Sequence, residues 1–337
     1  MGNRLALIGA AIGLGLLIKE YRKRQRMLNL EGQVALITGS SRGLGLALAR
    51  EFAQRGAHLV ICARQTEPLE NARQQLAALG TEVLAIPCDV SNQEQVQNMV
   101  RQTIDHFGQI DILVNNAGII TVGPQQTMTL SDYQDAMNIM FWGSVYTTLA
   151  VLPHMRARKS GHIVNITSIG GKVSVPHLLP YSCAKFASVG FSEGLHAELA
   201  KDDIHIITVV PGLMRTGSHI NAFVKGKRQV EYTLFGLLAT LPMTSMSAAD
   251  AARQIVQAVR RGDTETILTI QAQLASRFHG LLPGLTTEIF GLVNRFLPRS
   301  GETQKASGRA SRSKIATFLT GLGEPAAHEY NQYARKE

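Results

Sequence analysis

The sequence of 337 residues contains little cysteine, and its aromatic residues make up only 6% of the chain. The three cysteines, Cys62, Cys88 and Cys183, do not have the spacing of metal ligands. An odd number of cysteines in so long a chain also excludes a disulfide framework. We therefore expect reduced thiols and no metal site.

The N-terminal apolar stretch is short for a membrane span. Residues 5–18 carry no charge, whereas about 20 apolar residues usually cross a bilayer. A cleavable signal is disfavoured because the basic run at 19–26 follows the stretch instead of preceding it. We predict that residues 1–30 form an uncleaved membrane anchor helix with a basic flank, spanning the bilayer or lying in its plane. The alternative is a helix packed on the domain or on a partner subunit.

The net charge of +9 is concentrated at two places. Residues 1–26 and 295–314 each carry a net charge of +5, so the remainder of the chain is nearly neutral. Basic charge matters by where it lies, and a neutral core presents no face for nucleic acid. We expect membrane lipid, and no nucleic acid, as the partner of the basic segments. By the positive-inside rule the folded domain then lies on the cytosolic side.

The middle of the chain alternates short apolar runs with helical patterns. Strands are predicted at 34–38, 58–63, 82–87, 110–114, 162–166, 204–210 and 266–270, and helices at 44–55, 67–79, 92–107, 181–201 and 248–261, with another ending near 158. Buried runs that alternate with helices predict an α/β fold with a doubly wound parallel sheet, the Rossmann fold. The alternation never restarts, so residues 31–270 are predicted to form a single domain.

The C-terminal part departs from this pattern. Residues 271–300 are predicted to form an amphipathic helical extension, with a stripe of Leu285, Ile289, Leu292, Val293 and Phe296 on one face. The stripe either docks on the core or makes a second membrane contact. Residues 301–337 are predicted to form a basic, disordered tail.

The first strand ends in a glycine-rich turn that runs directly into a helix. It contains Gly39, Ser41, Arg42, Gly43, Leu44 and Gly45. Glycines allow a tight turn and close approach of a pyrophosphate, while the helix N-terminus supplies amide donors. The strand and helix around the turn favour a dinucleotide site over a plain turn.

The end of the second strand indicates which dinucleotide binds. NAD sites usually place an acidic residue there to hold the ribose 2′-hydroxyl, but this strand ends in Arg64, with no acid before Glu67. Arg64 and Arg42 can instead bind the 2′-phosphate of NADP. The cofactor prediction is NADP.

A tyrosine and a lysine four residues apart begin a later helix. Tyr181 and Lys185 share one helical face, and Ser168 lies at the end of the preceding strand, where the cofactor crevice is expected. A tyrosine has a solution pKa of about 10, so it needs a nearby cation such as Lys185 to ionise at neutral pH.

Together these motifs resemble those of the short-chain dehydrogenase/reductase (SDR) family, over residues 31–270. The chain looks like an NADP-preferring, membrane-tethered member. Besides the turn, the resemblance rests on Asp89 and Val90 near adenine, Asn116, Ala117 and Gly118 after the fourth strand, Asn138, Ser168, Tyr181 and Lys185 as the catalytic set, and Pro211, Gly212 and Thr216 near the nicotinamide amide.

The resemblance implies the following chemistry. NADPH would supply hydride to a carbonyl that is hydrogen-bonded by Ser168 and Tyr181, and Tyr181 would deliver the proton. Lys185 would lower the pKa of Tyr181 and hold the cofactor ribose, alongside Tyr181, and Asn138 would hold a water that links Lys185 to solvent. The resemblance also implies dimers or tetramers of the chain.

The segment 212–247 predicts the type of substrate. Its apolar residues are Phe223, Phe235, Leu237, Leu238 and Met243. They favour a lipophilic ketone, aldehyde, steroid, retinoid or 3-oxoacyl substrate, unless they are ordinary packing contacts. Two other functions stay open: a reductase of small or carrier-bound keto substrates, and a catalytically idle NADP-binding sensor or scaffold at the membrane.

Overall fold

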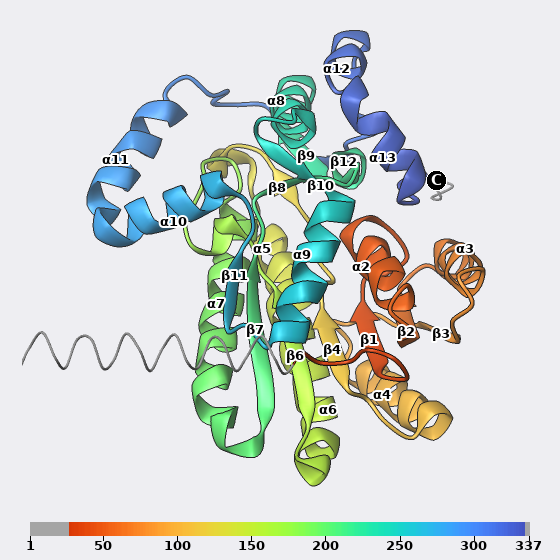
Figure 1. Ribbon diagram of the computed structural model, residues 1–337. Helices are drawn as coiled ribbons and strands as arrows, with labels where there is room; N and C mark the ends of the chain where they lie inside the picture. Colours follow the sequence, from red (N-terminus) through yellow and green to blue (C-terminus); the bar gives the residue numbers. More distant parts are fainter. Residues whose placement is uncertain (1–26, 334–337) are drawn as a thin grey trace, which may run out of the picture.

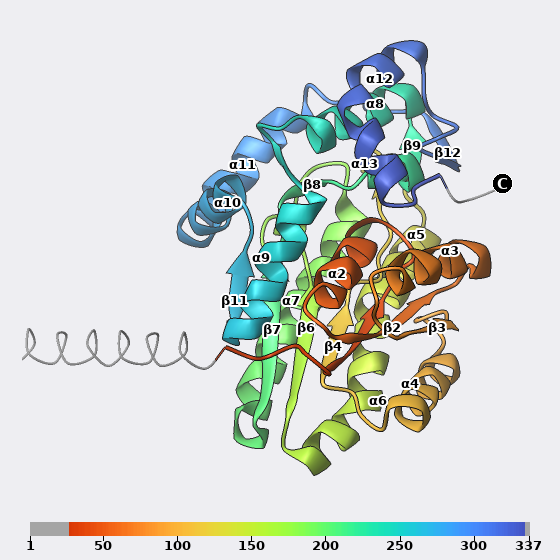
Figure 2. The same ribbon diagram turned by 45° about the vertical axis from the view of Figure 1, so that its right-hand side comes forward.

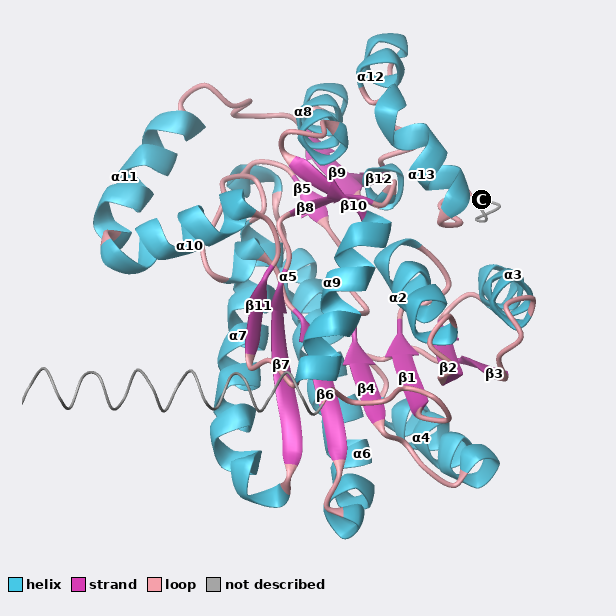
Figure 3. Ribbon diagram, viewed as in Figure 1, coloured by secondary structure: helices cyan, strands magenta, loops and turns pink. Residues whose placement is uncertain are grey.

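The computed structural model describes residues 27–333, and its centre is a parallel sheet of seven strands in the order β11-β7-β6-β4-β1-β2-β3 (Figures 1 and 3). The strands of this sheet are β1 (Val34–Thr38), β2 (His58–Ala63), β3 (Val83–Pro87), β4 (Ile112–Asn115), β6 (Gly161–Ile166), β7 (Ile204–Val210) and β11 (Glu265–Ile267). All of β1 is buried, as expected for a strand covered on both faces. The predicted α/β doubly wound fold is confirmed.

Helices cover both faces of the sheet (Figure 2). They are α2 (Gly43–Ala53), α3 (Thr66–Ala77), α4 (Gln93–Phe107), α5 (Leu130–Ala136), α6 (Gly143–Arg158), α7 (Leu179–Leu199), α8 (Arg228–Thr240) and α9 (Ala248–Arg261). One hydrophobic cluster joins the sheet to α2, α3 and α9, and a second joins it to α4 and α6. The two clusters pack on opposite faces of the same sheet, so the sheet and its helices form one domain.

The strand order changes direction at β1, which pairs with β2 on one side and with β4 on the other. Loops that follow these strands therefore diverge to opposite faces and leave a crevice at the carboxyl edge of the sheet. The glycine-rich turn and Ser168 both lie at this edge. The fold thus places the predicted cofactor and catalytic residues together.

Most element boundaries agree with the sequence prediction to within two residues. The strands at 58–63 and 204–210 and the helix at 248–261 have the predicted bounds. The predicted anchor at residues 1–30 falls almost entirely outside the described residues. Within residues 27–333, no helix is both long enough and apolar enough to cross a membrane.

The amphipathic extension consists of two helices instead of one. These are α10 (Ile270–Leu281) and α11 (Pro283–Asn294), which form an arm at one edge of the molecule (Figures 1 and 2). Leu282 has non-helical backbone angles, φ −133° and ψ 63°. A residue before proline is disfavoured in the helical region, so Pro283 ends one helix and begins the next.

The prediction of a disordered tail was wrong for residues 301–333. They form β12 (Glu302–Ser307), α12 (Lys314–Leu319) and α13 (Glu324–Glu329). Strand β12 pairs antiparallel with β9 (Phe223–Gly226), which also pairs with β5 (Thr121–Val122). Lys305 forms an ion pair with Asp135 at 2.6 Å. Composition did not predict this order because the pairing partner lies about 80 residues earlier in the chain.

Candidate active site

The glycine-rich turn between β1 and α2 is a tight structure that side chains would obstruct. Gly39 and Gly43 have positive φ angles of 64° and 59°. A Cβ atom at Gly45 would collide with the Gly39 carbonyl oxygen and would lie 2.6 Å from Asn116 Nδ2. Glycine at these positions therefore lets the turn fold flat against the end of β4.

Two side chains hold the turn in place. The Thr38 hydroxyl accepts the backbone N–H groups of Asn116 at 2.9 Å and Ala117 at 3.0 Å. The Asn116 side-chain amide donates to the carbonyl oxygens of Thr38 at 2.9 Å and Gly39 at 3.2 Å. The predicted cofactor residues Gly39, Asn116 and Ala117 thus form one hydrogen-bonded unit.

Helix α2 begins within this turn, and its N-terminal amides are suited to an anion. Ser41 and Leu44 are buried beneath the turn. Arg42 takes the N-cap position with extended backbone angles, and its side chain makes no capping bond to the helix. The first amides of a helix have no partner within it and carry the positive end of its dipole. A pyrophosphate fits this cradle because it needs those donors and a close backbone approach.

The ends of β2 and β3 lie beside the turn. Arg64 follows β2, its side chain is 55% exposed, and Nη1 lies 4.0 Å from the Asp89 carboxylate. Asp89 accepts hydrogen bonds from the backbone and hydroxyl of Ser91. Val90 is buried against Gly143, where a Cβ would lie 2.9 Å from a Val90 methyl. The structure therefore gathers Arg64, Asp89 and Val90 at one end of the crevice.

Ser168, Tyr181 and Lys185 converge at the other end of the crevice. Ser168 follows β6, and its hydroxyl accepts the Gly170 backbone N–H at 3.0 Å. A Cβ at Gly170 would lie 3.1 Å from the Tyr181 ring and 3.5 Å from the Ser168 hydroxyl. Lys185 is buried one turn further along α7, with Nζ 5.9 Å from the centre of the Tyr181 ring. Three of the four predicted catalytic residues thus share one site.

Burial controls the ionisation of this group. It raises the pKa of the Tyr181 phenol, and the hydrogen bond with Ser168 opposes that rise without reversing it. It also lowers the pKa of Lys185 to about 8. Lys185 donates its hydrogen bond to the Ile166 carbonyl oxygen at 2.7 Å. The expected lowering of the tyrosine pKa by Lys185 is therefore not found, because burial dominates and the ammonium group is directed at a carbonyl.

The remaining predicted catalytic residue, Asn138, lies in the turn before α6, and this turn packs against Tyr181 and Ala184 of α7. Asn138 lies in a π-helical turn, η2 (Met137–Trp142), where it is exposed, and its side chain has no hydrogen bond within residues 27–333. Met140, two residues later, is the buried residue of this turn and packs in a cluster with Ala184. The sequence could not predict which of Asn138 and Met140 is buried, because a π-helical turn changes which residue faces inward. The role predicted for Asn138, holding a water that links Lys185 to solvent, stays a prediction.

The loop after β7 completes the crevice. The Pro211 carbonyl oxygen accepts the Ile169 backbone N–H at 2.8 Å, which ties this loop to the segment after Ser168. A Cβ at Gly212 would lie 2.7 Å from the Thr269 hydroxyl, so the backbone approaches closely here. Thr216 is buried. Gly118 lies across the crevice, where its Cβ would be 3.6 Å from the Met140 sulfur.

Sequence reasoning missed a C-terminal segment that reaches the glycine-rich turn. The Gly43 backbone N–H donates to the Tyr330 carbonyl oxygen at 2.9 Å, and the Gln332 side chain donates to the Thr216 carbonyl oxygen at 2.9 Å. Helix α13 lies beside α2 in both views (Figures 1 and 2). No local pattern pointed to these residues, because their contacts join distant parts of the chain, 116 positions apart for Gln332 and Thr216 and still further for Tyr330 and Gly43.

A cavity of about 660 Å3 opens at Leu179, the first residue of α7, and Ser168, Tyr181 and Lys185 are not among the residues that line it. It lies between residues 174–179, which join Ser168 to Tyr181, and helix α11. The apolar part of its lining comes from Pro124, Val175, Pro176, Leu179, Phe290 and Pro298. None of the five apolar residues predicted from the segment 212–247 lines it: Leu238 and Met243 are exposed, and Phe223 packs beneath Lys305.

Comparisons with known proteins agree with this architecture. The family model described as short chain dehydrogenase matches residues 33–225. The chain is 34% identical over 269 residues to a "Dehydrogenase/reductase SDR family protein 7-like" of Anopheles gambiae, covering 78% of this chain and 82% of that one. It is 35% identical over 284 residues to "11-beta-hydroxysteroid dehydrogenase A" of Sesamum indicum, covering 82% and 79%.

A solved structure extends the similarity to three dimensions. L-sorbose reductase from Gluconobacter frateurii, complexed with NADPH and L-sorbose, superposes with a TM-score of 0.63 at 27% identity, covering 72% of this chain and 97% of that one. Enzymes of this fold bind a nicotinamide cofactor at the carboxyl edge of the sheet. With its family-model match, its parallel sheet and its catalytic edge, the chain belongs to the short-chain dehydrogenase/reductase family, whose members are oxidoreductases acting on CH–OH groups.

Proposed function

We propose that the protein is an NADP-dependent oxidoreductase that interconverts a lipophilic carbonyl compound and its alcohol. One observation carries the proposal: Ser168, Tyr181 and Lys185 converge at the sheet edge that also holds the glycine-rich turn. The bound cofactor would supply or accept hydride. A sensor or scaffold would not need this convergence of three side chains.

The ionisation of the site suits the reducing direction. Burial keeps the Tyr181 phenol protonated at neutral pH, so it can donate a hydrogen bond and then a proton to a carbonyl oxygen that gains negative charge. Ser168 is placed beside the phenol and would donate a second hydrogen bond to that oxygen. Lys185 keeps a positive charge below pH about 8, which stabilises the tyrosinate that remains after proton transfer.

The basic residues beside the turn favour NADP. Arg64 follows β2, where an NAD-binding site would place an acid, and Arg42 occupies the N-cap position of helix α2, at the turn. Asp89 lies 4.0 Å from Arg64, which positions the guanidinium at the end of the crevice without using it in a close ion pair. The similar L-sorbose reductase structure is described as an NADPH complex.

The apolar part of the cavity lining supports a lipophilic substrate. It comes from prolines, Val175, Leu179 and Phe290, whereas the rest of the lining is polar and includes His177 and Arg295. A site of this size and lining is typical of small-molecule ligands. The similar protein from Sesamum indicum is named as a hydroxysteroid dehydrogenase. A small polar or carrier-bound substrate would gain less from such walls.

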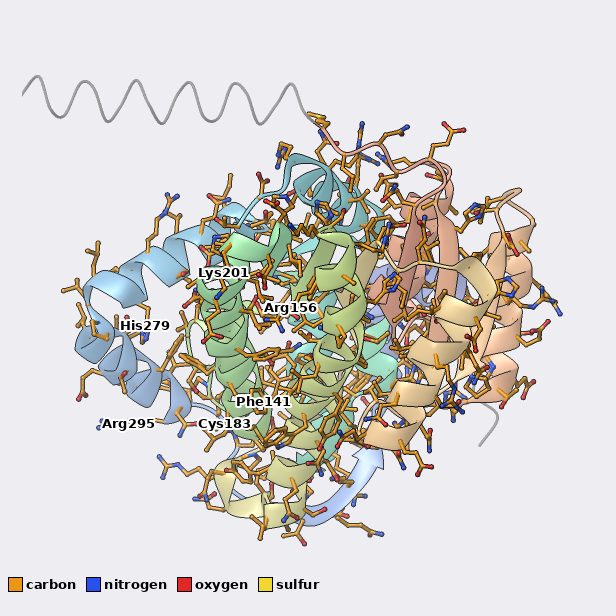
Figure 4. All side chains as sticks on the ribbon, turned by 90° about the horizontal axis from the view of Figure 1, so that it is seen from below. Phe141, Arg156, Cys183, Lys201, His279 and Arg295 are labelled. Atoms are coloured by element: carbon orange, nitrogen blue, oxygen red, sulfur yellow. The ribbon has the colours of Figure 1, made fainter. Side chains whose placement is uncertain are left out.

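Membrane association is a further part of the proposal. The helices α10 and α11 and the residues just after them expose large apolar side chains, among them Leu281 in α10 at 80% and Phe296 after α11 at 84%. Figure 4 shows the side chains of this arm, with His279 and Arg295 labelled, at the edge of the molecule. An apolar face flanked by Arg295 and Arg299 suits an anionic lipid surface. With the N-terminal segment, this would hold the cavity near lipid, with the catalytic domain on the cytosolic side.

We also propose that the chain forms a homo-oligomer. The elements η2, α6 and α7 expose Trp142, Leu149 and Phe186 respectively, at 42%, 57% and 41%. Neighbouring exposed apolar side chains of this size commonly mark a protein interface. A second copy of the chain would cover them.

The arginine prediction concerns cofactor choice. Replacing Arg42 and Arg64 together by alanine should raise the Kd for NADPH about 10- to 100-fold, because charge-assisted bonds to the 2′-phosphate are lost. The Kd for NADH should stay within about twofold, and the control Arg253→Ala on α9 should change neither value. Fluorescence titration measures all of these. Equal loss of both cofactors would contradict the role of the arginines.

The tyrosine prediction concerns catalysis. Tyr181→Phe should lower kcat for NADPH-dependent ketone reduction at least about 10³-fold, because the proton donor is removed, while NADPH still binds. Tyr146→Phe on α6 is the matched control and should keep wild-type rates. The assay follows NADPH absorbance over a panel of lipophilic ketones and aldehydes. If the Tyr181 variant reduced them as fast as the wild type, the sensor function would be favoured instead.

The pH prediction concerns Lys185. Because its pKa is lowered to about 8, the charge of Lys185 is present below that pH and is lost above it. The value of kcat/KM for reduction should therefore fall above pH about 8 with a single ionisation. In Lys185→Arg the side chain stays charged, so the fall should move to higher pH even if the maximal rate is lower. A fall at the same pH in both proteins would assign it to another group.

The membrane prediction tests the two segments that are proposed to contact lipid, residues 1–26 and the α10–α11 arm. Removing residues 1–26 should move the protein from the membrane pellet to the soluble fraction. If it remains in the pellet, Ile289→Glu with Phe296→Glu on the α11 arm should release it, because charges at a lipid-facing surface oppose insertion. Sedimentation with Arg253→Glu as the control variant measures both effects. Retention of the combined variant in the pellet would contradict membrane contact through these two segments.

A further inference from the structure

The C-terminal segment 324–332 lies on groups that the cofactor needs. The Tyr330 carbonyl oxygen accepts the Gly43 backbone N–H at 2.9 Å, at the start of α2. The Asn331 side chain donates to the Ser41 carbonyl oxygen at 3.3 Å. On the other side of the crevice, the Gln332 side chain donates to the Thr216 carbonyl oxygen at 2.9 Å. Ser41, Gly43 and Thr216 all belong to the predicted cofactor site.

Gln332 fills the space between the two sides of the crevice. It is only 2% exposed, and a Cβ at Gly43 would lie 3.0 Å from its Nε2 atom. Its side-chain and backbone oxygens accept the Asn221 amide at 2.7 and 3.0 Å. Ala327 packs so closely on Gly217 that a Cβ there would collide with the Ala327 backbone. The segment is therefore seated between the turn and the Thr216 loop.

A dinucleotide and this segment cannot use the crevice at the same time. A pyrophosphate at the N-terminus of α2 needs the N–H of Gly43, which the Tyr330 carbonyl oxygen already accepts. A dinucleotide that runs from Arg64 to Tyr181 must also pass between the turn and Thr216, where Gln332 lies. The Tyr330 carbonyl oxygen thus occupies the place where an oxygen of the cofactor pyrophosphate is expected.

Polar contacts with α2 and α3 hold the outer side of the segment. Arg50 on α2 lies 3.6 Å from Glu329 and stacks over the Tyr330 ring at 5.2 Å. Gln75 on α3 bonds the Asn331 side chain at 2.9 Å. The Glu329 carboxylate is 56% exposed, and ion pairs exposed to solvent are weak. Ala327 and Tyr330 are buried, and Tyr330 belongs to the apolar cluster of α2 and α9, so these contacts must also open when the segment leaves.

We propose that residues 324–332 are a built-in competitor of the nicotinamide cofactor, which binds only when the segment leaves the crevice. The inference rests on the proposed cofactor site. Only molecules whose crevice is free of the segment can bind the cofactor. The apparent Kd for the cofactor is therefore the intrinsic Kd divided by the fraction of such molecules. By linkage, the cofactor in turn drives the segment out.

Fluorescence titration of NADPH tests the proposal on the full chain. Gln332→Ala, and a chain that lacks residues 324–337, should bind NADPH about tenfold more tightly than wild type. Gln304→Ala, the same change in β12 away from the crevice, should match wild type. A synthetic peptide of residues 324–337 should weaken NADPH binding to the shortened chain. In the wild type, NADPH should displace the segment and therefore speed amide hydrogen exchange in residues 326–333.

The outcomes separate this inference from the proposed function. If the wild type binds NADPH and both altered chains bind it equally or more weakly, the competitor is overturned and the cofactor site stands. If only the shortened chain binds NADPH, the competitor is supported in its strongest form. If neither the wild type nor the shortened chain binds NADPH or NADH, both the inference and the proposed cofactor site fall.

Discussion

The close approach between the glycine-rich turn and the end of β4 is the constraint on which the crevice depends. Thr38 and Asn116 exchange hydrogen bonds across the point where the sheet changes direction, and Gly45 leaves room for the Asn116 amide. This contact opens the start of α2 toward the carboxyl edge of the sheet. Without it, the amides of α2 would not face the same space as Ser168.

Desolvation then gives the catalytic end its chemical character. Burial of Tyr181 and Lys185 favours the neutral form of each, so the phenol stays protonated and the ammonium group loses its proton more easily. The Ile166 carbonyl oxygen holds Lys185 in a fixed direction. A protonated donor beside a serine hydroxyl is what carbonyl reduction requires. The same burial explains why a nearby cation does not ionise the tyrosine here.

The parts added around the Rossmann domain all lie near its carboxyl edge. The α10–α11 arm borders the cavity at Leu179, and the α13 segment reaches the glycine-rich turn. The arm exposes large apolar side chains, whereas Ala327, Tyr330 and Gln332 of the segment are buried. In the two proposals, the arm borders the substrate site and the segment competes with the cofactor.

Local patterns in the sequence were sufficient for the repeating elements and for residues tied to them. Buried runs and helical periodicity predicted the strands of the central sheet and the helices α2, α3, α4, α7 and α9, but not β5 or α5. The glycine turn, Ser168, Tyr181 and Lys185 follow from their places at strand and helix ends. These features depend on residues close together in the chain. Element order then brings them to one edge, since parallel strands share a direction.

Only the tertiary structure determined the features that depend on residues far apart in the chain. Asn138 is exposed and Met140 is buried because they lie in a π-helical turn that packs on α7. The periodicity of the sequence does not predict such a turn. The order of residues 301–333 follows from pairing with β9 and packing on α2. A polar segment gains order only when a partner surface satisfies its backbone, and that partner is set by the fold and not by neighbouring residues.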